Sequence, residues 1–446
     1  MLGPGRWLRA RDMSRVQQAQ VPAGEASSDW LACLHEMFDL LWPPPTVVTL
    51  DSKWPAQMGL AGSRRRAGSG LAASPGDREF ALIAGIHRPP LMVPAQRRLA
   101  AAAVRQHSRP RSAAARMGVR ALCLGLGAGM GGSALRWTLR GRVQVATPAG
   151  ADTIDEHLNT VLSRDLAVSM YLGPARANRK PVLQLLAPTG EPAGFAKIGV
   201  NPLTRSLVRA EHDALMRLGQ AQLARVTVPR VLHYDTWRGL EVLVLSALPA
   251  WLPRHRLRPP RLVAAMAELA GVDGLTREPL ATSCYLSRLR ARLAATEHTP
   301  EWTALTQALG DITDRGGQQT LTLGAWHGDW SPWNMASTGN GLLVWDWERF
   351  ATGVPLGFDA LHHRLQAEVI GTRSDPQAAA LRCLERAPRN LAPFGLSPAQ
   401  ARLTAVLYLI ELATRYLADR QAQAGAPLGS PRTWLIPAIS QATVRL

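Results

Sequence analysis

LTLGAWHGDWSPWNMASTGNGLLVWDWERF, residues 321–350, is the stretch around which the rest of the chain is organised. It begins with an apolar run predicted to form a strand, continues into a polar loop, and returns to a second apolar run that ends in carboxylates. The loop opens with His327-Gly328-Asp329 and contains Asn334, and Asp346 directly follows the second apolar run. Two carboxylates and an amide in this order are groups that phosphoryl transfer requires.

The chain has 446 residues, enough for two or three domains, and a net charge of +18. Residues 51–150 carry most of this charge, with sixteen Lys/Arg against three Asp/Glu. One interpretation is contact with an anionic partner or a membrane surface through the basic N-terminal region. The other is a solvated arginine-rich surface, which we favour because Arg65 and its neighbours lack interleaved aromatic residues. For the same reason nucleic-acid binding is disfavoured.

The four cysteines, at positions 33, 123, 284 and 383, show neither CxxC nor Cys/His metal spacing. This pattern favours the reducing cytoplasm, and we expect a cytoplasmic protein. The longest uncharged apolar run of the N-terminal half, residues 121–135, is shorter than the roughly 20 residues that span a bilayer. We therefore expect no transmembrane segment.

The pattern of elements predicts an α+β protein with a small sheet lobe followed by a helical lobe. The expected divisions are a mostly poorly ordered basic segment at 1–78, a small α/β appendage or extension of the sheet lobe at 79–150, the sheet lobe at 151–249 and the helical lobe at 250–446. In the sheet lobe we expect an antiparallel sheet of five strands, at 166–172, 181–187, 193–200, 226–234 and 241–246, with a helix inserted at 203–218. A short amphipathic piece is expected around 30–41 within the poorly ordered segment. Further helices are expected at 95–106, 155–164, 261–270, 285–295, 301–313, 358–369 and 399–418, and short strands near 80–94.

Two charged residues occupy apolar positions in the sheet lobe. Lys197 lies in the middle of the apolar strand 193–200, and Glu211 lies on the apolar stripe of the following helix, in line with Leu207 and Leu215. A buried charge needs a partner, and each residue is the natural partner of the other. A Lys–Glu pair that holds the lysine against nucleotide phosphates explains both positions. The alternative for Lys197 alone is an edge-strand lysine that points to solvent.

The loop after the strand 321–326 supplies the remaining chemistry. Asp329 is expected to accept or orient the proton of a substrate hydroxyl, and Asn334 and Asp346 to supply the oxygen ligands that Mg²⁺ prefers. Asp329 and Asn334 could each be a turn residue instead, but that reading does not account for the whole ordered set. His327 is interpreted as a structural residue of the catalytic loop that bonds to loop backbone. His362 and His363 are expected to be ordinary helix residues.

The stretch WHGDWSPWN…LLVWDWE resembles the signature of the aminoglycoside phosphotransferase and choline kinase-like family, over about residues 155–446. The resemblance implies a bilobal protein kinase-like fold and transfer of the γ-phosphoryl group of ATP (or GTP), with Mg²⁺, to a hydroxyl of a small-molecule acceptor. It assigns Asp329 as the base and Asn334 and Asp346 as Mg²⁺ ligands. It also implies nucleotide contacts by Lys197, Glu211, the loop that contains Gly173, and the hinge that contains Ser246 and Leu248.

Two departures from the family pattern bear on these expectations. The phosphate loop at 172–180 has a single glycine, Gly173, followed by Pro174, although Arg176, Arg179 or Lys180 could assist. Glu348 stands where protein kinases have glycine, and no activation segment follows it, which favours a small-molecule acceptor. The rival interpretation is a catalytically inactive kinase-like protein that binds nucleotide or regulates a partner. The complete set of catalytic residues disfavours it.

Overall fold

The computed structural model describes residues 25–52, 77–83, 91–107, 113–128, 139–251, 255–339, 341–372, 374–426 and 428–444. Arg65 and most of the segment 1–78 that we expect to be poorly ordered lie outside these ranges. Within that segment the described residues form a helix, α1 (Glu25–Leu41), and a strand, β1 (Val47–Ser52).

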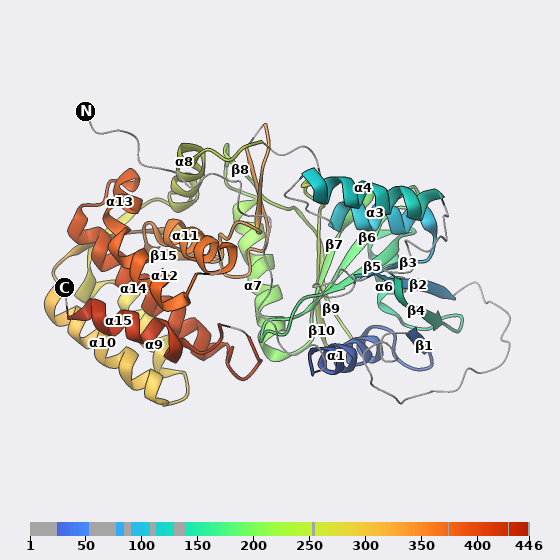
Figure 1. The fold of residues 1–446 in the computed structure, drawn as a ribbon, viewed down its shortest axis with the longest axis horizontal. Coiled ribbons are helices and arrows are strands. Elements are labelled where there is room, and N and C mark those ends of the chain that lie inside the picture. Colours follow the sequence, from blue (N-terminus) through green and yellow to red (C-terminus); the bar gives the residue numbers. More distant parts are fainter. Residues whose placement is uncertain are drawn as a thin grey trace.

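The chain forms two lobes, with a strand-rich lobe built from residues before about 250 and a helix-rich lobe after them (Figure 1). This arrangement confirms the predicted α+β class. The first lobe is organised on one nine-stranded sheet with the order β1-β4-β2-β3-β5-β6-β7-β10-β9. Its other strands are β2 (Arg78–Ile83), β3 (Leu91–Pro94), β4 (Leu139–Ala146), β5 (Ala167–Leu172), β6 (Pro181–Leu186), β7 (Pro192–Gly199), β9 (Val231–Trp237) and β10 (Leu240–Leu245).

The five strands expected in the sheet lobe are adjacent in this sheet, as β5-β6-β7-β10-β9, and every pairing among them is antiparallel. The inserted helix is α7 (Pro202–Leu218). The prediction was wrong in one place, because the expected strand 226–234 is two strands. Pro229 has no N–H to donate to a ladder, and the chain breaks there into β8 (Val226–Thr227) and β9. β8 pairs with β14 (Leu342–Val344) of the second lobe instead.

The sheet is wider than expected because β1 to β4 continue it beyond β5. Met92 of β3 pairs with Met170 of β5, and the Ser169 hydroxyl donates a hydrogen bond of 2.8 Å to the Met92 carbonyl oxygen. Side chains alternate between the two faces of a strand. Phe80 and Leu82 of β2 pack with α1, whereas Leu91 and Val93 of β3 pack with α3 (Arg97–His107).

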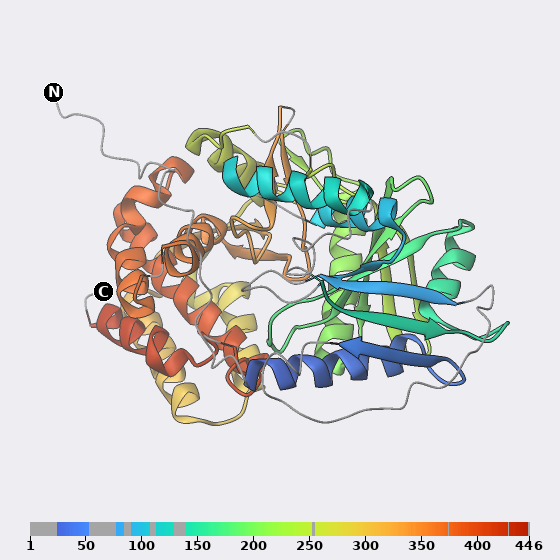
Figure 2. The same ribbon diagram turned by 45° about the vertical axis from the view of Figure 1, so that its right-hand side comes forward.

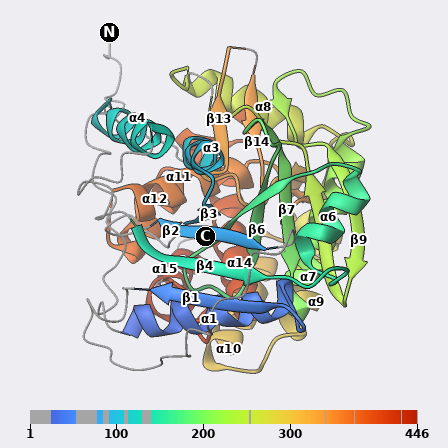
Figure 3. The same ribbon diagram turned by 90° about the vertical axis from the view of Figure 1, so that its right-hand side faces the viewer.

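Helices cover both faces of this extended sheet. Figures 2 and 3 show α1 on one face and α3 with α4 on the other. Besides α1 and α7, the described part of this lobe contains the helices α3 (Arg97–His107), α4 (Ala113–Ala128) and α6 (Ile154–Leu162). Residues of α1 and α6 share one hydrophobic core with β2, β4, β5, β7 and β10, so the described residues before 150 and the strands after them are packed as a unit.

The second lobe is built around α14 (Pro398–Ala418), which runs through its core with thirteen buried residues. A capping box between Ser397 and Gln400 and a proline in the first turn begin this helix. The other helices are α8 (Pro259–Ala270), α9 (Cys284–Ala294), α10 (Pro300–Gly316), α11 (Phe358–Gly371), α12 (Pro376–Glu385), α13 (Ala387–Leu391) and α15 (Leu435–Thr443), with short 3-10 turns at Leu280–Thr282, Ala392–Phe394 and Pro431–Thr433.

Two small sheets in the second lobe carry the stretch 321–350. One has the order β11-β12-β15, with β11 (Thr276–Pro279), β12 (Thr320–Trp326) and β15 (Ala351–Pro355). The other has the order β13-β14-β8, with β13 (Met335–Ser337) and β14 (Leu342–Val344). The polar loop of the stretch thus leaves β12 and enters β13, and Asp346 follows β14. None of the helices in the described ranges is long and apolar enough to cross a membrane.

Candidate active site

Lys197 connects the two lobes. It lies on β7, and its side chain, 12% exposed, places Nζ 2.7 and 2.6 Å from the two carboxylate oxygens of Glu211 and 2.6 Å from Oδ1 of Asp346. The Lys–Glu pair expected from the sequence is therefore present, and Asp346 of the second lobe joins it. Burial alone would lower the pKa of Lys197, but Asp346 and Glu211 hold it above its usual range. Lys197 thus remains a cation.

Glu211 is positioned by the start of α7. Asn201 and Thr204 form a capping box, and the helix that follows carries Glu211 into the core with no exposed surface. One of its carboxylate oxygens also accepts a hydrogen bond of 3.2 Å from the Trp347 N–H. Burial raises the pKa of Glu211, while Lys197 opposes the rise.

The loop after β12 is fixed by Asp359, in the first turn of α11. The carboxyl group of Asp359 accepts hydrogen bonds from the backbone N–H of His327 (2.8 Å) and of Gly328 (3.2 Å). Gly328 has a φ of 83°, and a Cβ there would lie 2.2 Å from the Arg349 carbonyl oxygen, so only glycine fits. Sequence reasoning did not identify Asp359, although its place at the start of a helix after the signature stretch is a readable signal.

His327 is fully buried and bonds to backbone on both sides. Its Nδ1 accepts a hydrogen bond of 3.1 Å from the Asp329 N–H, so Nε2 carries the proton and donates to the Trp345 carbonyl oxygen at 3.1 Å. Burial lowers the pKa of His327 to about 4, in agreement with a neutral ring. Because Trp345 precedes Asp346, this histidine links the loop to the carboxylate that contacts Lys197.

The Asp329 carboxylate is held at both oxygens and remains 34% exposed. Asn334 donates from Nδ2 to Oδ2 at 2.9 Å and to the Asp329 carbonyl oxygen at 3.0 Å. The other oxygen, Oδ1, lies 2.8 Å from Nε2 of His362. A carboxylate that is fixed in rotation and partly open is suited to accept a proton from a bound hydroxyl.

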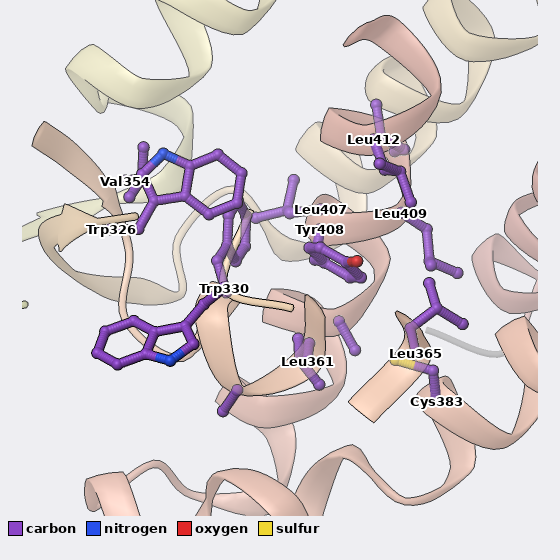
Figure 4. Close-up of a cluster of buried hydrophobic side chains, with 14 of the residues drawn as sticks. Trp326, Trp330, Val354, Leu361, Leu365, Cys383, Leu407, Tyr408, Leu409 and Leu412 are labelled. Carbon is purple, nitrogen blue, oxygen red and sulfur yellow. The ribbon is translucent and has the colours of Figure 1, made fainter. Parts of the chain in front are cut away.

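His362 is therefore a correction to the sequence interpretation, which took it as an ordinary helix residue. Its Nδ1 lies 3.0 Å from the hydroxyl of Tyr408, a buried residue of α14 whose pKa burial raises well above 10. A tyrosine that stays protonated donates to Nδ1, so Nε2–H donates to Asp329. Figure 4 shows Tyr408 in the same buried cluster as Trp326 and Leu361. The missed signal is the spacing Asp359-x-x-His362, which puts both side chains on one helix face.

Glu348 is a second residue to which the sequence analysis assigned no role in the site. It is 5% exposed, and its carboxylate forms a salt bridge with Lys180 and accepts a hydrogen bond of 3.0 Å from Asn178. Both partners belong to the loop between β5 and β6. Ligand oxygens of Glu211, Asp346 and Glu348 lie within 4.8 Å of one another. Three carboxylates thus face two lysines.

The remaining predicted nucleotide contacts lie in the first lobe. Gly173 follows β5, and its surroundings are open, since a Cβ there would meet no atom within 4 Å. Ser246 follows β10, and both its N–H and its hydroxyl are engaged with the backbone of Arg230, at 2.8 and 2.9 Å. Leu248 is half-buried, and its carbonyl oxygen accepts from the Ala250 N–H at 2.7 Å. The structure thus brings Lys197, Glu211 and Asp346 together, whereas Ser246 is bonded to Arg230.

Comparison with known proteins extends these observations. Residues 199–363 match the model of the phosphotransferase enzyme family. No match was found among curated proteins.

Solved structures that resemble the chain include three bacterial proteins. A putative fructosamine-3-kinase from Thermobifida fusca is 17% identical, with a TM-score of 0.39, and the match covers 66% of this chain and 99% of that one. The choline kinase LicA from Streptococcus pneumoniae is 12% identical, with a TM-score of 0.40 and coverage of 66% and 98%. A choline/ethanolamine kinase family protein from Mesorhizobium loti is 16% identical, with a TM-score of 0.35 and coverage of 59% and 88%.

The matched segment contains Glu211, the loop with Asp329 and Asn334, and Asp346. The predicted resemblance to phosphotransferases is therefore confirmed over residues 199–363, a segment that runs from the strand-rich lobe into the helix-rich lobe.

Proposed function

We propose that this protein transfers the γ-phosphoryl group of ATP or GTP, with Mg²⁺, to a hydroxyl of a small molecule. The observation that carries the proposal is the contact of Lys197 with Glu211 of one lobe and Asp346 of the other. A lysine kept charged and oriented by carboxylates can bind nucleotide phosphates. The family match supports the reaction class.

The donor atoms at this position fit a magnesium ion. Mg²⁺ prefers carboxylate and amide oxygens, and Asp346, Glu348 and Asn334 offer such oxygens. With two lysines against three carboxylates, the cluster retains negative charge that a cation can neutralise. When bound, Mg²⁺ would neutralise the charge on the phosphate oxygens. Asp346 and Asn334 are the ligands we expect, and Glu348 is an additional candidate.

In the proposed reaction Asp329 orients the acceptor hydroxyl and takes its proton as the oxygen attacks the γ-phosphorus. The bond from phosphorus to the bridging oxygen breaks, and the nucleoside diphosphate leaves with that electron pair. Asn334 and His362 each contact one oxygen of the carboxylate and so prevent it from rotating, which preserves its alignment with the hydroxyl. We assign the nucleotide base to the segment that contains Ser246 and Leu248, which follows β10 between the two lobes.

We place the acceptor beside the loop, in a cavity of about 840 Å³ whose wall reaches the end of β12 but does not include Asp329 itself. Trp326 and Arg415 form part of its wall, and Arg415 donates a hydrogen bond of 2.7 Å to the Gly328 carbonyl oxygen. Two of its acids, Glu411 and Asp419, are paired with arginines in the same wall. The full set of charged lining residues is Arg288, Arg292, Arg349, Arg415, Arg420, Glu297, Glu301, Glu411 and Asp419. This balance favours a neutral or anionic acceptor over a polycationic one.

The test is a nucleotide-consumption screen with ATP and GTP over cationic, neutral and anionic hydroxyl compounds. We expect consumption that depends on Mg²⁺ and on the acceptor, and that Asp329→Asn abolishes it while nucleotide binding, followed by thermal shift, is retained. Turnover unchanged in Asp329→Asn would remove Asp329 from the mechanism. Nucleotide binding without turnover on any acceptor would favour the inactive, regulatory alternative.

A further inference from the structure

Three side chains that the phosphotransferase site does not use converge on the opposite face of the first-lobe sheet. Tyr234 of β9 and Lys197 of β7 both pair with Leu243 of β10, so they share the face that α7 covers. His233 and Asp235 flank Tyr234 on β9 and therefore point to the other face, where α6 packs. His157, from α6, completes the group.

The ligand atoms of these three residues are close together. Nε2 of His157 lies 2.9 Å and Nε2 of His233 lies 3.0 Å from the same oxygen, Oδ2 of Asp235. All three potential ligand atoms lie within 4.8 Å of one another. Two imidazoles and one carboxylate are thus arranged around a common point.

These short contacts are ion-pair distances that lack hydrogen-bond geometry. Both Nε2 atoms and Oδ1 of Asp235 are buried atoms without a hydrogen-bond partner in the described part of the chain. A buried polar atom without a hydrogen-bond partner destabilises the folded state, and three of them in one cluster need an explanation. A bound cation would satisfy the two ring nitrogens together, and the carboxylate with them.

The surroundings fix the geometry and leave one side open. The Trp237 ring stacks on His157 with centroids 5.8 Å apart and 25° between the planes, and Trp237 donates from Nε1 to Asp152 at 2.6 Å. The side chains of His157, His233 and Asp235 remain 16%, 27% and 28% exposed. The ligand atoms themselves are buried, but the partly exposed side chains place them close to the surface, where a water molecule can reach a bound ion.

We propose that His157, His233 and Asp235 form a binding site for a divalent transition-metal ion of the Zn²⁺ type, with water in the remaining position. Imidazole nitrogen suits Zn²⁺ and its neighbours, whereas Mg²⁺ and Ca²⁺ prefer sites made of oxygen. The bound ion joins α6 to β9, which is the edge strand of the sheet. It thus stabilises the start of the kinase-like lobe and is separate from the Mg²⁺ site proposed beside Lys197.

The experiment uses the full chain, stripped with a chelator and dialysed against Zn²⁺ in excess Mg²⁺, followed by elemental analysis. We expect one Zn²⁺ per chain in the wild type and its loss in His157→Gln and His233→Gln. His212→Gln is the matched control, because His212 also contacts a carboxylate, Asp213 at 2.9 Å, but no second histidine joins that pair. The control should keep the ion.

Two further readouts keep the proposal testable if a histidine variant folds poorly. Asp235→Asn keeps the shape of the side chain and should weaken Zn²⁺ binding at least tenfold by calorimetry. Co²⁺ loaded in place of Zn²⁺ should give visible absorption of a four- or five-coordinate ion that disappears in Asp235→Asn. A wild type that binds no stoichiometric Zn²⁺, or a Zn²⁺ ion retained in Asp235→Asn with unchanged affinity, overturns the proposal.

Discussion

Nε2 of His362 lies 2.8 Å from Oδ1 of Asp329, and the hydroxyl of Tyr408 lies 3.0 Å from the other nitrogen of the same ring. This chain of bonds orients the carboxylate proposed as the base. A hydrogen bond to a charged group contributes about 1.5–3 kcal/mol, and we expect His362→Ala to lower kcat roughly 10- to 100-fold at an unchanged KM for nucleotide. Steady-state kinetics at several pH values measure both parameters.

The neighbouring His363 gives a matched control, because its Nδ1 bonds to the Trp330 carbonyl oxygen at 3.1 Å and not to Asp329. His363→Ala should affect stability more than kcat. His362→Gln should restore part of the rate, since the glutamine amide can donate from nearly the position of Nε2. Equal losses of kcat in the two alanine variants would mean that His362 acts through the fold rather than through Asp329.

The sequence predicted those parts of the site whose signal is local. Lys197 and Glu211 could be found because charges interrupt apolar patterns, and Asp329, Asn334 and Asp346 because they occur together in one stretch. His362 and Glu348 could not be assigned in the same way. Their partners, Tyr408 and Lys180, are brought near by packing between distant segments.

The same distinction applies to the fold. Strands β5, β6, β7 and β10 alternate or are continuously apolar and were predicted near their observed bounds. The pairing of β3 with β5 could not be predicted, because it joins residues 78 positions apart, Met92 and Met170, and no local pattern gives the register of such strands. The break at Pro229 was readable from the sequence, since proline is excluded from the interior of a ladder.

Because Lys180 and Glu348 form a buried salt bridge, we expect the effects of substituting them on stability to be non-additive. Lys180→Met leaves Glu348 as a buried charge without its cation, which should cost about 3–5 kcal/mol of unfolding free energy. The double variant Lys180→Met/Glu348→Gln should recover much of that loss, because it removes both charges. Chemical denaturation measures the cycle. If the single losses simply add, the two residues are not coupled and the salt bridge has no role in stability.

His327 predicts a dependence of stability on pH. Its pKa is about 4 in the folded chain and 6.5 ordinarily, so between these values the unfolded imidazole binds a proton that the folded one lacks. The stability that His327 contributes is therefore complete above pH 6.5 and is lost as the pH falls toward 4, by about 1.4 kcal/mol per pH unit.

The variant His327→Gln isolates this contribution. Asp359 acts in the opposite direction, because burial raises its pKa to about 7 and its folded form keeps a proton that the unfolded form releases. Asp359 is common to both proteins, so the comparison cancels most of its effect. Between pH 4.5 and 6.5 the wild type should take up about one more proton on unfolding than His327→Gln does. The slope of unfolding free energy against pH should therefore differ between the two proteins by about 1.4 kcal/mol per pH unit. Parallel pH profiles would contradict a neutral, buried His327.

Because β1 to β4 extend the sheet beyond β5, we expect residues 151–446 to be unstable when residues 1–150 are deleted. Deleting residues 1–150 turns β5 into a sheet edge and uncovers the core residues Val168 and Met170, which pack with Phe38 and Trp42 of the first segment. An exposed apolar edge strand promotes aggregation. We expect the fragment 151–446 to be insoluble or oligomeric by size-exclusion chromatography, whereas the full chain is not.

Point substitutions at Trp42 test the same packing in the intact chain. Trp42→Ala should lower the unfolding free energy by about 3–5 kcal/mol, and Trp42→Phe by less, since it keeps an aromatic ring and loses mainly the 2.8 Å bond to Asp155. A monomeric 151–446 fragment that unfolds at the temperature of the full chain would show that the two parts are independent domains.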